Sequence, residues 1–280
     1  MEIIPKINLA REKHRITSFI KNVLRKQGFK KVIIGMSGGI DSTASFYLLK
    51  EAIAPENIIV AHLYYLNSQF SDIGGIVKKA GVPKNNIYEI SIDPLAKAFQ
   101  SVIPSAVEEP HSTQPDEQDP STRPSDLVGM TEERVRLGNI MARIRMIILY
   151  DLAKKHNALV CGTENKSEFL LGYFTRFGDQ ASDFEPIQHL YKTQVYKLAK
   201  ILGVPENIIK KTPTAGLWHG QTDEREFGFT YKEADQVLFY YYDKKLKIEE
   251  IKSMGFKNAE KIINFSLRNS YKHHAPYAIK

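Results

Sequence analysis

Residues 35–42, GMSGGIDS, begin where the apolar run KVIIGM at 31–36 ends. A glycine-rich turn between a strand and a helix lets backbone N–H groups converge on an anion, with the positive end of the helix dipole behind them. Gly38 and Gly39 also lack the Cβ atoms that would hold a phosphate away from the backbone. The stretch therefore predicts a phosphate-binding loop.

Three side chains of this loop refine the prediction. The hydroxyls of Ser37 and Ser42 can donate to phosphate oxygens. The carboxylate of Asp41 would repel a phosphate unless a cation lay between them, so it implies bound Mg²⁺. The spacing matches neither G-x-x-x-x-G-K-[ST] nor G-x-G-x-x-G, which excludes two common phosphate loops at this position.

Three more short apolar runs follow the first, at 58–63 (IIVAHL), 87–92 (IYEISI) and 158–163 (ALVCGT). Residues 42–52 and 71–80 separate the first three runs and are long enough for crossover helices. This alternation predicts an α/β fold, a Rossmann-like doubly wound parallel sheet flanked by helices. Further helices are expected over 11–27, 132–156, 192–202, 230–242, 246–254 and 257–270, which gives a helical C-terminal part.

Length and composition narrow the class of protein. With 280 residues and 42% hydrophobic residues, we expect a single domain over 1–280. The sequence shows neither a signal peptide nor an apolar run long enough for a membrane span, so we expect a cytoplasmic protein without a membrane partner. The single cysteine, Cys161, excludes an internal disulfide and a multi-cysteine zinc site. The net charge of +7 suits an anionic partner such as a nucleotide.

Residues 104–126 break the pattern, because they hold five prolines, many acidic groups and few apolar ones. Such a segment cannot offset the entropy lost on packing, so we expect a mobile insertion. A surface insertion and a substrate lid are both compatible with it. Residues 212–228, with Trp218 and three glycines, are expected to form a flexible loop over the site.

Beyond these physical arguments, the S-G-G-x-D-S loop resembles that of the ATP pyrophosphatases, which split ATP between its α- and β-phosphates. Three longer stretches, at 138–146 (GNIMARIRM), 162–187 and 191–231, resemble the NAD synthetase family and occur in the family's order. With the loop, they cover 84 of the 280 residues. The resemblance implies ATP-driven amidation of nicotinic acid adenine dinucleotide to NAD through an acyl adenylate, with release of AMP and pyrophosphate.

The resemblance also implies site residues. It implies ATP contacts at Gly35, Met36, Ser37, Gly38, Gly39, Ile40, Asp41, Ser42, Thr163, Lys192 and Thr214. It implies Mg²⁺ ligands at Asp41 and Glu168. It implies dinucleotide contacts at Asn139, Arg143, Arg176, Asp179, Asp183, Tyr271 and Lys272. Asp179 is expected to help ammonium lose a proton, and Lys192 to stabilise the departing pyrophosphate.

Two of these positions depart from the family pattern. Arg176 stands where lysine is usual, and Tyr271 where histidine is usual, so the contacts of both are altered. Asn139 and Arg143 are four residues apart and therefore share one face of a helix. His273 and His274 are expected in a solvated tail rather than in a metal site, because adjacent imidazoles on a helix point apart.

The nitrogen source and the partners follow from the same resemblance. Glutamine-using relatives add an amidase domain, for which there is no room before the loop at residue 35, so free ammonia is the expected donor. A separate glutaminase subunit stays possible at this point. The resemblance implies a homodimer and no nucleic-acid partner. Two other hypotheses stay open, a tRNA-modifying ATP pyrophosphatase and a nucleotide-binding regulatory protein without catalysis.

Overall fold

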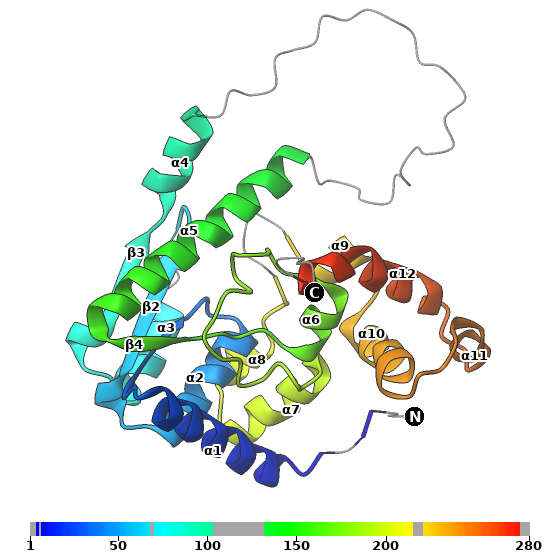
Figure 1. Cartoon of the computed structure of the whole chain (residues 1–280), viewed down its shortest axis with the longest axis horizontal. Coiled ribbons are helices and arrows are strands. Elements are labelled where there is room, and N and C mark those ends of the chain that lie inside the picture. Colours follow the sequence, from blue (N-terminus) through cyan, green and yellow to red (C-terminus); the bar gives the residue numbers. More distant parts are fainter. Residues whose placement is uncertain (1–3, 6, 68–69, 103–131, 215–220, 275–280) are drawn as a thin grey trace, which may run out of the picture.

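The computed structural model describes residues 4–5, 7–67, 70–102, 132–214 and 221–274, so the insertion expected at 104–126 lies outside the described residues. Its centre is a four-stranded parallel sheet in the order β3-β2-β1-β4 (Figure 1). The strands are β1 (Lys31–Gly35), β2 (Ile58–Tyr64), β3 (Ile87–Ser91) and β4 (Ala158–Cys161).

The two central strands, β1 and β2, are buried almost throughout, which is why their sequences are continuous runs of β-branched residues. Ile34 of β1 lies opposite Val60 on one side and Cys161 on the other. Beyond β4, residues 183–184 run parallel to its edge, where Gly162 N donates to Phe184 O at 2.9 Å. This extension brings residues 182–185 beside the carboxyl end of β4.

Helices cover both faces of the sheet (Figure 1). One apolar core joins the sheet to α1 (Leu9–Gln27), α2 (Ile40–Ala52), α3 (Phe70–Lys79) and α7 (Lys192–Leu202). A second core lies on the opposite face, under α4 (Asp93–Val102) and α5 (Glu132–His156). The predicted doubly wound α/β fold is therefore confirmed.

A third apolar core belongs to the helical C-terminal part and is rich in aromatic rings. It is built from α6 (Lys166–Leu171), α10 (Tyr231–Leu238), α11 (Ile248–Ser253) and α12 (Ala259–Asn269). Phe227 of α9 (Asp223–Phe227) stands at its centre, edge-on to Tyr173, Tyr231 and Phe265. The short α8 (Glu206–Ile209) follows α7.

The sequence missed four helices, α4, α6, α8 and α9, because they are too short, or too poor in apolar repeats, to stand out. The helix predicted over 230–242 ends as an α-helix at Leu238 and continues as a π-helix over Phe239–Asp243. Within the described ranges, no helix has the length and apolar composition needed to cross a bilayer.

The strand order contains one reversal. The chain proceeds from β1 outward to β2 and β3, and then returns through α5 to place β4 on the other side of β1. Open α/β sheets bind ligands at the carboxyl ends of the strands that flank such a reversal. The phosphate loop after β1 and the GTENKSE stretch after β4 meet at this point.

Core packing behind the loop can be tested on α2, which starts at the loop. Leu48 of α2 is fully buried, so Leu48→Ala should lower the free energy of unfolding by about 2–5 kcal/mol. Leu267→Ala is the matched control, because that leucine is 44% exposed on α12. Urea titration measures both; equal losses in the two variants would contradict this description of the core.

Candidate active site

The conformation of the loop after β1 is fixed by its glycines and by hydrogen bonds within the loop. Gly38 has φ +80°, a left-handed conformation that favours glycine, and Gly39 caps the start of α2. Gly39 N donates to Ser37 Oγ at 3.2 Å, and the hydroxyls of Ser42 and Thr43 donate to Gly39 O. The Ser37 and Ser42 hydroxyls lie 3.1 Å apart. Both predicted serines therefore face one small volume at the helix N-terminus.

An ammonium group lies between two carboxylates next to this loop. Lys192 Nζ is 2.6 Å from Asp41 Oδ2 and 2.9 Å from Glu168 Oε1. The lysine side chain is only 3% exposed, against 16% for Asp41 and 17% for Glu168. Three residues that are far apart in the sequence thus form one cluster.

Short helices place these side chains. Asp41 lies in the first turn of α2, and Lys192 is the first residue of α7. Glu168 is the third residue of α6 and forms a capping box with Asn165. Asn165 Nδ2 also donates to Asp41 Oδ1 at 3.0 Å, so one amide connects the helix cap to the cluster.

Burial and charge act against each other in this cluster. Burial raises the pKa of Glu168 to about 8, although the nearby Lys192 ammonium lowers it. Burial alone would lower the pKa of Lys192, but Asp41 and Glu168 outweigh it and hold that pKa well above its usual value. The lysine is therefore charged. The ring of Tyr231, centred 5.0 Å from Lys192 Nζ, adds a cation–π contact.

The chemistry of the pair fits Mg²⁺. This ion commonly binds through one or two carboxylates, water and substrate phosphates, and Asp41 and Glu168 are close enough to share one cation. In the part of the chain that the structure describes, no group of three or more His, Cys, Asp or Glu residues is arranged to hold a metal. Phosphate oxygens and water would therefore have to complete the coordination.

A second polar cluster lies around residues 172–179. Thr175 connects two of its members, since its hydroxyl donates to Asn139 Oδ1 at 2.8 Å and its backbone N–H to Asp179 Oδ1 at 2.9 Å. Arg143 Nη2 donates to Arg176 O at 3.3 Å. Desolvation by the surrounding protein raises the pKa of Asp179, and the Thr175 hydrogen bonds lower it in part.

The C-terminal end of the described chain closes this second cluster. Lys272 Nζ donates to Gly172 O at 2.7 Å and to Phe174 O at 3.0 Å. Tyr271 is 52% exposed, and its ring is centred 6.0 Å from the Arg176 guanidinium. Five of the predicted dinucleotide contacts besides Asp179 therefore lie near it: Asn139, Arg143, Arg176, Tyr271 and Lys272.

The remaining predicted residues occupy other places. The Asp183 carboxylate accepts a hydrogen bond from Val160 N at 2.7 Å, which ties it to the outer edge of β4. Met36 and Ile40 point into the core, so only their backbones can face a phosphate. Thr163 follows β4 and Thr214 is exposed. Trp218 of the predicted flexible loop lies outside the described residues.

Sequence reasoning missed several members of the site. Arg145, which it left unassigned, donates from Nε to Leu63 O at 3.1 Å and interacts with Asp179. A methyl group added at Gly38 would lie 3.6 Å from Lys211 Nζ, so this lysine reaches the phosphate loop. In the sequence, only the pair of lysines that precedes Thr214 indicated a role for Lys211.

The expectation of a solvated histidine tail was wrong for His273. Its Nε2–H donates to Phe169 O at 2.5 Å, and its ring lies 4.4 Å from the Phe169 ring. The chain after α12 packs onto α6 at this point, and the His273 ring packs against the rings of Phe169 and Phe174. An aromatic contact between distant segments leaves no local pattern in the sequence.

A pair of buried glutamates lies between the two clusters. Glu185 Oε2 accepts from Glu164 N at 3.0 Å, and its Oε1 accepts from Ser182 Oγ at 2.8 Å. Burial raises the pKa of Glu185 to about 7 and that of Glu164 to about 9. The sequence analysis assigned neither residue a role.

Comparison with known proteins gives a consistent picture. The NAD synthase family model matches residues 12–276. The NH(3)-dependent NAD(+) synthetase of Thermococcus kodakarensis is 40% identical over 93% of each chain. Two solved structures cover 98% of this chain and 100% of their own: the NMN synthetase of Francisella tularensis (TM-score 0.75, 28% identity) and the NH3-dependent NAD synthetase of Campylobacter jejuni (TM-score 0.72, 27% identity).

The raised pKa of Glu185 predicts a pH effect on stability. Because its pKa is about 7 in the folded protein and 4.5 in its usual state, protonation favours the folded form. This contribution is full below pH 4.5 and is lost as the pH rises through 7. As the pH rises over that range, the free energy of unfolding of Glu185→Gln should therefore fall less than that of the wild type. The difference should be at most about 3 kcal/mol.

Chemical denaturation at a series of pH values, in buffer free of ammonium and potassium, measures this effect. Glu206→Gln is the control, since that glutamate is exposed in a surface pair with Lys210. The control should keep the wild-type slope. If the Glu185→Gln curve ran parallel to the wild-type curve, the carboxylate would titrate normally in the fold.

Proposed function

We propose, because the chain belongs to the NAD synthase family, that it is an ammonia-dependent ligase that amidates nicotinic acid adenine dinucleotide to NAD, the final step of NAD biosynthesis. The reaction cleaves ATP to AMP and pyrophosphate. The observation that carries the proposal is the Lys192 ammonium held by Asp41 and Glu168 beside a phosphate loop at the reversal of the sheet.

ATP binds through its phosphates to the loop. The backbone N–H groups at the start of α2 and the hydroxyls of Ser37 and Ser42 face the space where the phosphates would lie. Lys211, which reaches Gly38, adds a positive charge on the other side of the loop. These groups hold the α-phosphorus still for attack, and orientation of this kind lowers the barrier substantially.

Asp41 and Glu168 would hold Mg²⁺, which when bound neutralises charge on the phosphates. The Lys192 ammonium lies beside the same two carboxylates. It would stabilise the charge that develops on the leaving pyrophosphate.

The second cluster orients the acceptor. Arg143, Arg176 and Lys272 are cations around Asp179, and they suit a dinucleotide with a pyrophosphate and a free carboxylate. The acceptor carboxylate attacks the α-phosphorus, a carboxyl oxygen–phosphorus bond forms, and the bond to pyrophosphate breaks. An acyl adenylate results. The exposed Tyr271 ring, beside Arg176, offers a surface for stacking.

Ammonia then attacks the acyl carbon, and AMP leaves with the bonding electrons. Ammonium has no lone pair, so one proton must be removed first. Asp179 is suited to this role because desolvation raises its pKa and makes it a better base. Free ammonia as the donor agrees with the full-length match to an NH(3)-dependent relative.

A second candidate differs only in the acceptor. The similarity to an NMN synthetase, at a TM-score of 0.75, favours a test of the mononucleotide carboxylate in the same site. The dinucleotide remains the leading acceptor, because Arg143, Arg176, Tyr271 and Lys272 spread along an extended cluster. We expect the enzyme in the cytoplasm, as its free, buried Cys161 suits a reducing compartment.

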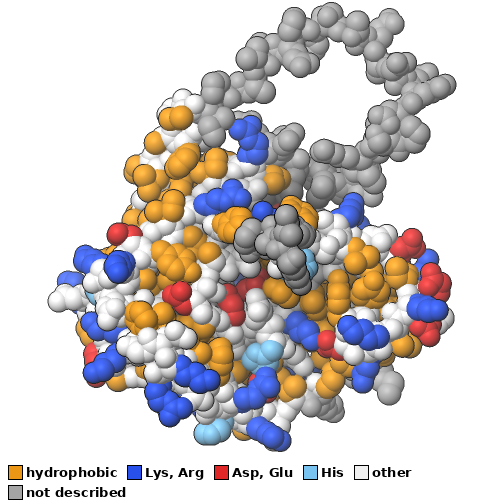
Figure 2. Space-filling model, viewed as in Figure 1, with side chains coloured by type: hydrophobic (Ala, Val, Ile, Leu, Met, Phe, Trp, Pro, Cys, Tyr) orange, Lys and Arg blue, Asp and Glu red, His pale blue; other side chains and the backbone are white. Residues whose placement is uncertain are grey.

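We also propose a homodimer that forms through α4 and α5. Figure 2 shows hydrophobic side chains gathered over these helices. Exposed apolar residues on them are Leu95, Phe99, Val102, Val135, Ile147 and Tyr150. Arg143, Ile147 and Tyr150 fall at spacings of four and three on α5, so the apolar stripe continues into the dinucleotide cluster. A second copy on this face would complete that cluster.

Product analysis tests the reaction. With ATP, Mg²⁺, nicotinic acid adenine dinucleotide and ammonium, we expect NAD and AMP in equal amounts, and much less product with the mononucleotide or with glutamine. Lys192→Met should lower kcat by about 10²–10³ because it removes a charge that stabilises the transition state. Lys200→Met, on an exposed position of the same helix, should change nothing.

Three results would count against the proposal: amidation of the mononucleotide in preference to the dinucleotide, equal use of glutamine, or full activity of the Lys192→Met variant. Pyrophosphate release without NAD would point to another acceptor. A steep salt dependence of tRNA binding would then support the tRNA-modifying alternative.

The homodimer is tested separately by light scattering. Wild-type protein should show twice the chain mass of 31.9 kDa. Ile147→Glu should give the single-chain mass and weaken dinucleotide binding, because a charge would be buried in the apolar stripe. Ile201→Glu is the control, because that isoleucine of α7 is also more than half exposed, at 54% against 64% for Ile147. A monomeric wild-type protein with full activity would contradict the proposed interface.

A further inference from the structure

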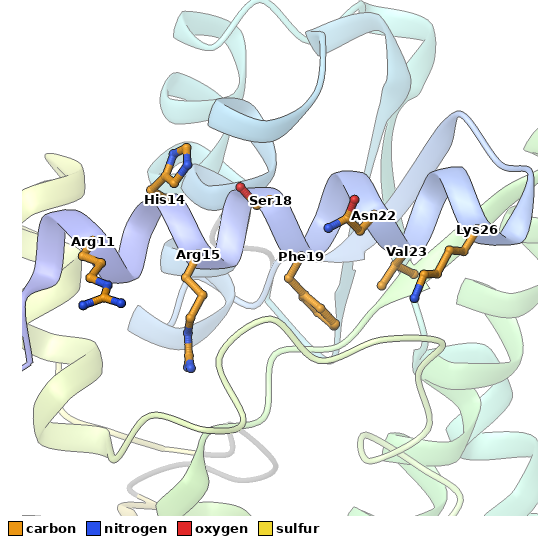
Figure 3. Close-up of a pocket in the computed structure, with 8 residues that line it drawn as sticks. All are labelled: Arg11, His14, Arg15, Ser18, Phe19, Asn22, Val23 and Lys26. Atoms are coloured by element: carbon orange, nitrogen blue, oxygen red, sulfur yellow. The ribbon is translucent and has the colours of Figure 1, made fainter.

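A cavity of about 370 Å³ lies between α1 and the segment that follows the extension of β4. Its lining residues are Arg15, Ile16, Phe19, Glu185, Pro186, Gln188 and His189. It shares Arg15 and Phe19 with a larger cavity of about 590 Å³ along α1. Figure 3 shows these two side chains pointing from the same side of α1. The wall of the smaller cavity includes Glu185, one of the two glutamates.

Glu185 is fixed against the backbone that follows β4. A methyl group at Gly162 would lie 1.8 Å from Glu185 Oε1, so the carboxylate fills the space that a side chain would need. Its oxygens accept hydrogen bonds from Glu164 N and Ser182 Oγ, both of which are uncharged donors. Among the ion pairs between described residues, none involves Glu185 or Glu164.

Glu164, the second glutamate of the pair, is only 6% exposed. Gln188 Nε2, from the cavity wall, donates to its Oε2 at 2.7 Å. Its Oε1 is buried and has no hydrogen-bond partner within the described residues. A buried polar atom without a partner is costly, and it marks a place where a donor is missing.

We propose that Glu164 and Glu185 bind ammonium at the carboxyl end of β4, near Asp179. The ion would enter through the cavity beside α1. This inference rests on the proposed function, in which ammonium is the nitrogen source. The ammonium ion is small and carries four N–H donors. It can therefore supply the partner that Glu164 Oε1 lacks, and it places a positive charge beside Glu185.

The charges along the path support this direction of entry. Arg15, at the mouth of the cavity, is paired with Glu12 at 2.8 Å, so its own charge is partly neutralised. Glu185 lines the cavity, and Asp179 acts electrostatically on both glutamates. Acidic groups that lie close together attract a cation.

Glu185→Gln tests the site. The amide keeps the shape that fits against Gly162 but removes the charge, so the KM for ammonium should rise about ten- to a hundredfold. The KM values for ATP and the dinucleotide should stay unchanged. Hydroxylamine, which is largely uncharged at neutral pH, should react equally well with both proteins. Glu206→Gln is the charge-removing control on the surface.

Exchange of labelled pyrophosphate into ATP separates this inference from the proposed function. Exchange that requires the dinucleotide, in wild type and Glu185→Gln alike, shows that adenylylation works without the ammonium site. An unchanged KM for ammonium in that variant would then overturn the site alone. If the wild type gave no exchange, the proposed function itself would have failed.

Competition with potassium is the second test, because potassium has the charge and about the size of ammonium. In wild type, added potassium should compete with ammonium and raise its apparent KM, and in Glu185→Gln this effect should disappear. Sodium is the control ion. Competition that persists in the variant, or a loss of hydroxylamine reactivity equal to that of ammonium, would mean that Glu185 only supports the structure around Gly162.

Discussion

The buried ammonium group of Lys192, held at 2.6 Å from Asp41 and 2.9 Å from Glu168, is the interaction on which the site depends. It joins the first turn of α2, the start of α6 and the start of α7, three elements that are far apart in the sequence. Its positive charge offsets the repulsion between two carboxyl groups that lie close together. In the proposed function, the same three side chains bind the metal and the phosphates of ATP.

The sheet explains why these elements meet. Because β4 returns to the free side of β1, the loops after both strands share one edge, and the helices that begin there point their N-termini into it. The extension at residues 183–184 then ties the acceptor cluster and the glutamate pair to the same edge. The three clusters thus lie around one edge of the sheet.

Much of this was predictable from sequence. The β-branched runs predicted the strands, and the glycines of GMSGGIDS predicted the turn from β1 into α2, because both signals are local. Contacts between distant segments were not predictable from local patterns: the fit of Glu185 against Gly162, the bond from Asp183 to Val160 and the packing of His273 on Phe169. The capping box of Asn165 with Glu168 and its bond to Asp41 were not predicted either.

The central claim is that the acceptor carboxylate attacks the α-phosphorus of ATP at this site. The direct measurement uses dinucleotide whose nicotinic acid carboxylate carries a heavy oxygen isotope, with mass spectrometry of the AMP formed. The account predicts that one labelled oxygen passes into the phosphate of AMP, because the carboxyl oxygen–phosphorus bond survives when ammonia displaces AMP. AMP without label, with the isotope recovered elsewhere, would contradict it.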